Sequence, residues 1–210
     1  FVKEVVINEK VPVKKLKQVQ KKAKNIILFI GDGMSVSQIS AFRLFQGGPN
    51  SRVAVDSFPY SGKVLTHSAN AIVTDSASSG TAFSAGEKTN NRALGVDING
   101  QPIENITETL DRSGYVSSVI STSEVTHATP AAFVVHTSSR YLTDEISIQM
   151  TDSKIRNILG GGRKFFIPEE DGGNREDGIN LIEKVKSKST LITDKSELSN
   201  PARYGDNQVF

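Results

Sequence analysis

Short apolar runs that alternate with amphipathic helical stretches constrain the fold of this chain more than any other feature. The runs at residues 24–30 and 115–122 are short and apolar, as buried parallel strands are. Helical patterns at residues 35–45 and 103–113 each end at glycine. This alternation predicts an α/β fold in which helices cover a mainly parallel sheet.

The same alternation continues through the rest of the chain. We expect a strand-like segment at 61–68, a helix of small residues at 76–86, further helices and strands within 130–135, 153–159 and 180–188, and loops at 90–102 and 169–177. In this architecture, sites assemble beyond the carboxyl ends of the strands. Asp32 and the segment 123–129 follow two such ends, so we expect them to contribute to one site.

Composition excludes several classes of function. With 37% hydrophobic and 23% charged residues, the chain has the composition of a soluble globular protein. The longest purely apolar run, 26–30, is far shorter than the roughly 20 residues of a membrane span. The absence of cysteine excludes disulfides and thiolate metal sites, and a net charge of +2 does not indicate a nucleic-acid partner.

The basic residues gather near the start of the chain, between residues 10 and 24. We interpret residues 1–23 as a solvated leader or surface segment, with a polyanion-docking arm as the alternative. Because the chain begins with Phe1, we expect a processed or trimmed N-terminus.

Asp32 lies between Gly31 and Gly33, directly after the first predicted strand. Flanking glycines permit a tight turn and a close approach of a ligand to the backbone. A carboxylate there can bind one metal ion or bridge two. The alternative is an ordinary turn or capping aspartate.

Ser76 follows Asp75, a possible N-cap, at the first turn of the predicted helix 76–86. Helix N-termini favour negative charge, which suits both an alkoxide nucleophile and an incoming phosphate. A serine hydroxyl requires a base or a metal ion for activation. The alternative is a simple capping serine.

Three further side chains follow the strand 115–122. His127 and Thr129 can face one ion from an extended segment, and Arg140 can hold a phosphate through its planar pair of donors. The alternatives are a hydrogen-bonded loop histidine and a surface arginine. His67 and His136 form no recognisable zinc spacing.

Four segments form a pattern that resembles the alkaline phosphatases, which are metal-dependent phosphomonoesterases. These segments are NIILFIGDGMS, VTDSASSGTAFSAGEKTNN with ALGVDI, TSEVTHATPAAFVVHTSSR and ILGGGRKFF, spread from about residue 24 to residue 166. The resemblance implies a three-layer α/β sandwich, of which residues 24–210 would form the N-terminal portion of a single domain.

The resemblance also implies roles for individual residues. Ser76 would be the nucleophile that becomes phosphorylated, Arg140 would hold the phosphate oxygens, and Asp75 would orient Arg140. Asp32 would bridge the second of two Zn²⁺ ions and a third ion, Mg²⁺, with Thr129 as a magnesium ligand. At the position of His127, enteric bacterial members carry aspartate. This chain resembles the animal and some marine bacterial members instead, so the resemblance implies that Zn²⁺ or Co²⁺ can replace Mg²⁺ there.

The family takes its other metal ligands from a later half that this sequence does not show. We therefore expect a missing C-terminal half as a partner, and an isolated 210-residue piece that is inactive. The resemblance further implies phosphate monoester substrates, inorganic phosphate as product, a homodimer, and a periplasmic or extracellular location. Two alternatives remain: a phosphodiesterase, sulfatase or phosphomutase relative, and an inactive fragment that acts only in assembly.

Overall fold

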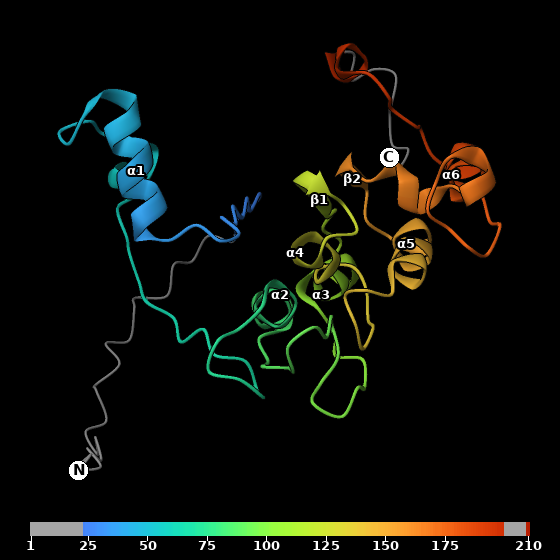
Figure 1. Ribbon diagram of the computed structural model, residues 1–210, viewed down its shortest axis with the longest axis horizontal. Coiled ribbons are helices and arrows are strands. Elements are labelled where there is room, and N and C mark those ends of the chain that lie inside the picture. Colours follow the sequence, from blue (N-terminus) through green and yellow to red (C-terminus); the bar gives the residue numbers. More distant parts are fainter. Residues whose placement is uncertain (1–22, 200–208) are drawn as a thin grey trace.

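A two-stranded parallel sheet lies near the centre of the described structure. The computed structural model describes residues 23–199 and 209–210. Strands β1 (Ser118–Glu124) and β2 (Asn157–Gly161) pair in parallel, with Val119 opposite Ile158. Beyond β2, Val209 forms parallel bridges to Asn157 and Thr190. This parallel pair, with helices around it, is the α/β arrangement that the alternation predicts (Figure 1).

Six α-helices and four short 3₁₀ helices belong to the part of the chain that the structure describes. The α-helices are α1 (Val36–Gly47), α2 (Ser76–Ala85), α3 (Ile106–Arg112), α4 (Ala128–Ala131), α5 (Thr143–Asp152) and α6 (Leu181–Lys188). The 3₁₀ helices are η1 (Ala54–Ser57), η2 (Arg163–Phe166), η3 (Glu169–Asp171) and η4 (Lys195–Ser199). None of the helices in the two described ranges is long and apolar enough to cross a membrane.

The core lies between the sheet and the helices that follow α2. Apolar side chains from α4, α5, α6 and both strands form one buried cluster, which includes Ala131, Ile146, Met150, Ile158 and Leu181. The hydrophobic effect favours this cluster in proportion to the apolar area that it removes from water. The core therefore fixes α4, which follows β1, as part of a rigid body.

Helix α2 packs on α4 through a face of small residues. Ala77, Gly80 and Ser84 recur at helical spacing and are buried. Ser84 Oγ donates a hydrogen bond of 2.6 Å to the carbonyl oxygen of Ala132, just after α4. Because these side chains are so small, the two helices approach closely, as the adjacent ribbons in Figure 1 show.

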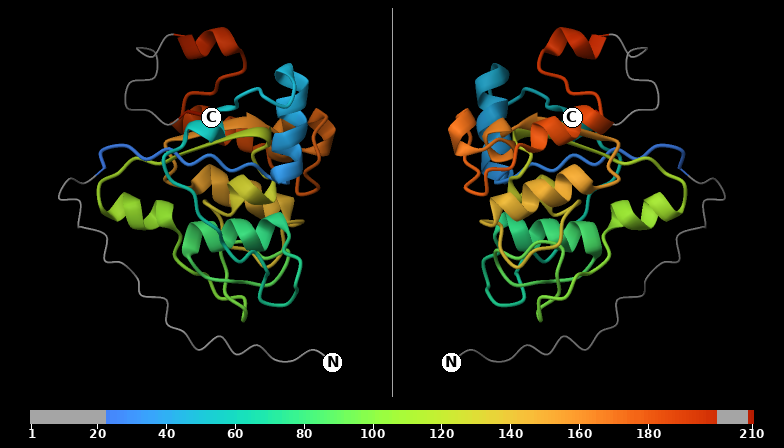
Figure 2. Two further views of the ribbon diagram at one scale, coloured as in Figure 1. Left: turned by 90° about the vertical axis from the view of Figure 1, so that its left-hand side faces the viewer. Right: turned by 90° about the vertical axis from the view of Figure 1, so that its right-hand side faces the viewer.

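Helix α1 stands apart from this body. No residue of α1 is buried. In both views of Figure 2, α1 (light blue) stands above α2 (green) and does not pack along it. The connection between the two parts comes instead from the turn before α1, which carries Asp32.

Most predicted helices are confirmed. Segments 35–45, 76–86 and 180–188 correspond to α1, α2 and α6. Helix α3 begins at Ile106, later than predicted, because Asn105 accepts hydrogen bonds from the backbone N–H groups of Thr107 and Glu108 and acts as the N-cap. Helix α5 is absent from the prediction because its mixed sequence lacks a clear apolar stripe.

The strand predictions at 24–30 and 61–68 are wrong for this structure. Neither segment is a strand, and both are exposed except at Ser68; Phe29 is 88% exposed and Leu65 78% exposed. A strand needs neighbouring strands to satisfy its N–H and C=O groups, and none of the described residues pairs with 24–30. Apolar composition alone therefore overestimated the sheet.

Two other predictions concern the loop 169–177 and the segment 1–23. The loop 169–177 is not wholly at the surface, because the Arg175 side chain is buried and bonded to Asp177, Ser147 and backbone carbonyls. Of the predicted segment 1–23, residues 1–22 lie outside the described residues.

Candidate active site

Asp32 occupies a four-residue turn immediately before α1. The Met34 N–H donates to the Gly31 carbonyl oxygen at 3.1 Å and closes the turn. Gly33 has φ of 66°, a conformation that residues with a Cβ adopt at a steric cost. The turn therefore explains the glycine after Asp32.

The Asp32 carboxylate joins side chains from α2 and α4. Its Oδ1 accepts a hydrogen bond of 3.0 Å from Ser76 Oγ, and its Oδ2 accepts one of 2.9 Å from Thr129 Oγ1. Both hydroxyls belong to the first turn of their helices. Three distant segments of the chain thus bring a carboxylate and two hydroxyls together, with each carboxylate oxygen facing a different hydroxyl.

Asp75 is the N-cap of α2 and binds several donors. Its Oδ1 accepts from the Ser78 N–H at 3.0 Å and its Oδ2 from the Arg92 N–H at 3.1 Å. Partial burial raises the pKa of Asp75, but hydrogen bonds from Ser78, Arg92 and Arg140 outweigh this effect and lower the pKa overall. The cap is therefore a charged carboxylate at neutral pH.

Arg140 lies between Asp75 and His127. Its Nη1 is 3.4 Å from Asp75 Oδ2, and its Nη2 is 3.1 Å from His127 Nε2. Because a guanidinium only donates, His127 Nε2 acts as the acceptor in this contact. His127 Nδ1 is 3.7 Å from Asp32 Oδ2, so the ring joins Arg140 to the Asp32 group.

The donor set matches part of a metal site. Asp32, His127, Thr129 and Ser76 offer oxygen and imidazole donors, which suit Mg²⁺ and Zn²⁺. Only one of them is a carboxylate, and no group of three or more His, Cys, Asp or Glu side chains within residues 23–199 and 209–210 could hold an ion. The described residues therefore fit one side of a metal centre and do not complete it.

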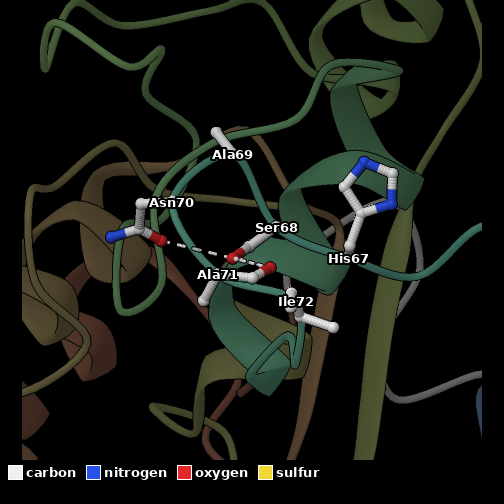
Figure 3. Close-up of a pocket in the computed structure, with 6 residues that line it drawn as sticks. All are labelled: His67, Ser68, Ala69, Asn70, Ala71 and Ile72. Carbon is white, nitrogen blue, oxygen red and sulfur yellow. Dashed lines mark hydrogen bonds between the residues drawn. The ribbon is translucent and has the colours of Figure 1, made fainter. Parts of the chain in front are cut away.

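A separate depression in the described surface lies away from these residues. A cavity of about 520 Å³ is lined by the six consecutive residues 67–72 and includes none of the predicted site residues. Figure 3 shows that the His67 ring points away from the hydrogen bond between Ser68 and Asn70. His136 also lies outside the site, where its ring nitrogens contact the Gly95 carbonyl oxygen and Glu108.

Two neighbouring residues support the site and were not predicted. Asn91 Oδ1 accepts hydrogen bonds from the Asp75 N–H and from Ser78 Oγ, while Asn91 Nδ2 donates to the Val73 carbonyl oxygen. Arg92 follows with φ of 76°. The sequence signal at Asn90-Asn91 indicated a turn, but not that the turn holds the Asp75 cap.

The structure is that of an α/β protein in which a serine and a threonine contact one aspartate, and an arginine contacts a second aspartate and a histidine. The family model of alkaline phosphatase matches residues 23–208. This chain belongs to the alkaline phosphatase family.

Individual relatives agree with this assignment. Alkaline phosphatase 4 of Bacillus subtilis is 34% identical, over 92% of this chain and 42% of its own length. The solved structure of alkaline phosphatase from the Antarctic bacterium TAB5 has a TM-score of 0.73 and 33% identity, and the match covers 85% of this chain and 50% of that one. A His-to-Glu variant of that enzyme, with Mg bound in its M3 site, gives the same TM-score at 32% identity, covering 85% of this chain and 49% of the variant.

These matches confirm the predicted family and the α/β fold. The chain spans about half the length of the relatives that it matches, since it covers 42% of the Bacillus enzyme and 50% of the TAB5 enzyme.

Proposed function

We propose that the protein that carries this chain hydrolyses phosphate monoesters in a metal-dependent reaction, with Ser76 as the nucleophile. The observation that carries the proposal is the hydrogen bond of 3.0 Å from Ser76 Oγ to Asp32 Oδ1, at the first turn of α2. Membership of the alkaline phosphatase family supports it.

The surroundings of Ser76 favour its attack on a negatively charged phosphoryl group. Its contact with Asp32 orients Oγ, and the N-terminus of α2 favours the negative charge of a phosphoryl group beside it. Attack forms the bond between Oγ and phosphorus while the ester oxygen leaves, and water then releases phosphate from the phosphoserine. The phosphoryl group is therefore transferred from the substrate oxygen to Ser76 Oγ, and the resulting phosphoserine is hydrolysed in a second step.

Arg140 holds the phosphoryl oxygens, and Asp75 orients Arg140. The planar guanidinium can donate two parallel hydrogen bonds to a phosphate. Its contacts with Asp75 at 3.4 Å and His127 at 3.1 Å restrict its rotation before substrate binds. Such preorganisation lowers the cost of orienting the donor in the transition state.

Asp32, Thr129 and His127 would hold metal ions. We assign Asp32 as a ligand shared by the second of two Zn²⁺ sites and a third site, and Thr129 and His127 to that third site for Mg²⁺, which Zn²⁺ or Co²⁺ can replace. Bound ions would lower the pKa of the serine hydroxyl and stabilise charge on the phosphoryl oxygens. The remaining ligands come from outside the described residues, because these supply only one side of the centre.

The family relationship supports three further proposals. Residues 24–210 form the N-terminal portion of one catalytic domain, the protein is periplasmic or extracellular, and it works as a homodimer. A second half of the domain supplies the other metal ligands, so this chain alone is inactive.

Replacement of Ser76 tests the function. With the metal-loaded protein, we expect Ser76→Ala to abolish the acid-stable phosphoserine that forms from labelled phosphate monoester, and to lower kcat by orders of magnitude. Ser79→Ala is the matched control, because Ser79 lies on the same helix and its hydroxyl donates only to the Asp75 carbonyl oxygen. Near-normal turnover by Ser76→Ala would refute the proposal.

A substrate panel separates the related activities. A phosphate monoester, a phosphate diester and a sulfate ester with the same leaving group should be hydrolysed in that order of preference. A diester or sulfate that reacts faster than the monoester would assign the protein to another activity. This chain alone should be inactive. Its mixture with the remainder of the domain should be active.

A further inference from the structure

The backbone conformation of Arg92 is unusual for a residue with a long side chain. Among the described residues it is the only residue other than glycine with a positive φ, 76°. Bulky side chains adopt this conformation at a steric cost, and such strain is often found at functional sites. The presence of arginine at position 92, despite this steric cost, therefore requires an explanation.

The backbone of Arg92 joins two parts of the candidate site. Its N–H donates to Asp75 Oδ2 at 3.1 Å, and its carbonyl oxygen accepts from the Arg140 N–H at 2.7 Å. Glycine would make both hydrogen bonds without strain. The architecture of the site thus requires the conformation at position 92, but not the guanidinium.

The guanidinium itself is available for a ligand. It lies over the ring of Tyr141, 5.8 Å from the ring centre, and both side chains are exposed. Within residues 23–199 and 209–210 it makes no ion pair and no hydrogen bond. Arg140, in contrast, is already paired with Asp75 and His127. The aromatic contact holds a cation whose donors are unused.

We propose that Arg92, held against Tyr141, binds a second anionic group of the substrate, next to the phosphoryl group that Arg140 receives. The inference rests on the proposed function and narrows its substrate class to phosphate compounds whose leaving group carries a further phosphate. In a nucleoside diphosphate, for example, the bond that breaks is the anhydride bond to the terminal phosphate, and the nucleoside monophosphate leaves. The hydrogen bond from the Arg140 N–H to the Arg92 carbonyl oxygen places the two arginines on adjacent backbone segments. A planar guanidinium that binds no acceptor among the described residues suits a phosphate group.

The test compares a substrate with an anionic leaving group and one with a neutral leaving group. In the metal-loaded protein, we expect Arg92→Gly to lower the ratio of kcat/KM for a nucleoside diphosphate to kcat/KM for p-nitrophenyl phosphate about tenfold, since one charge contact is lost. Glycine keeps both backbone hydrogen bonds and removes the strain. Arg52→Gly removes another exposed arginine and should leave the ratio unchanged.

Inhibition provides a readout that does not depend on the leaving group. Inorganic pyrophosphate should compete better than inorganic phosphate in the unaltered protein, and Arg92→Gly should remove most of this difference. Arg92→Asn, which also tolerates the left-handed conformation, should give the same result and covers the case in which the glycine variant does not fold. A ratio and a pyrophosphate preference within twofold of the unaltered protein would overturn the inference.

The proposed function and this inference fail in different ways. If Ser76→Ala keeps its activity, the proposed nucleophile is wrong, whereas binding of pyrophosphate and phosphate, measured by calorimetry, still decides the role of Arg92. If Ser76→Ala is inactive but Arg92→Gly keeps the pyrophosphate preference, the inference alone is wrong.

Discussion

The contact between Gly80 of α2 and Ala132, just after α4, offers a sharp test of how this fold positions its candidate site. A Cβ at position 80 would lie 2.9 Å from the Ala132 Cβ, whereas it would meet the Thr129 Cα at 3.7 Å, an ordinary distance. Gly80→Ala therefore adds one methyl group at the point where the two helices that carry Ser76 and Thr129 come closest.

The structural and energetic effects of Gly80→Ala can be estimated. Two methyl carbons pack at about 3.5–4.0 Å, so the helices must separate by roughly 0.6–1.1 Å. Overpacking of this kind costs about 1–3 kcal/mol, and the higher helix propensity of alanine returns about 1 kcal/mol. The net loss of stability is therefore about 0–2 kcal/mol. A displacement of about 1 Å between catalytic groups can nevertheless lower the rate about 100-fold.

We expect a variant whose activity falls much more than its stability. The free energy of unfolding from urea titration and kcat/KM for a phosphate monoester should be measured on the same preparations. Gly62→Ala is the control, since a Cβ there meets no atom within 4 Å. The double variant Gly80→Ala with Ala132→Gly restores the missing space and should recover most of the activity. A fully active Gly80→Ala variant, or a double variant as inactive as the single one, would refute the reasoning.

Three further predictions concern charged groups and a metal site. Arg175→Ala should lower the free energy of unfolding by about 3–5 kcal/mol, because it removes a buried guanidinium and leaves Ser147 and two carbonyl groups without their donor; a loss below 1 kcal/mol in urea titration would contradict this. The hydrogen bond from Arg175 also lowers the pKa of Asp177, so the stability that this carboxylate contributes is present at neutral pH and is lost as the pH falls below about 4. The stability difference between the unaltered protein and Asp177→Asn should therefore shrink from pH 6 to pH 3, and a constant difference would rule out the linkage. Finally, His127→Asp should strengthen Mg²⁺ binding relative to Zn²⁺, because a second carboxylate suits a hard cation, and calorimetric titration of both ions on the metal-free protein checks it.

The sequence was most informative where a local rule decides the structure. Capping predicts the start of α2 at Asp75, and the glycines around Asp32 predict a turn that presents a carboxylate. The contact between Asp32 and Thr129 joins residues 97 positions apart. The expectation that both contribute to one site rested on two predicted strand ends, but segment 24–30 is not a strand here, and the turn before α1 carries Asp32 instead. The predictions of the cap and the turn needed only short-range chemistry.

The sequence did not reveal which residues far apart in the chain contact one another. Segment 24–30 has the composition of a buried strand, but composition does not reveal whether a neighbouring strand is present, and Phe29 is exposed here. Arg175 shows the converse, because a charged residue in a polar, glycine-rich loop is buried by contacts with α5 and η2.

Arg92 combines both difficulties and explains why the support of the site was missed. Its local signal is a turn after two asparagines, where arginine would be interpreted as a solvated surface residue. Its positive φ follows only from the need to place one N–H on Asp75 and one carbonyl oxygen on the Arg140 N–H, and both partners are distant in sequence. Since glycine meets that need with less strain, the arginine is informative only once the fold is known. The arginine at this strained position therefore directs attention to its side chain, which lies over the ring of Tyr141, the residue after Arg140.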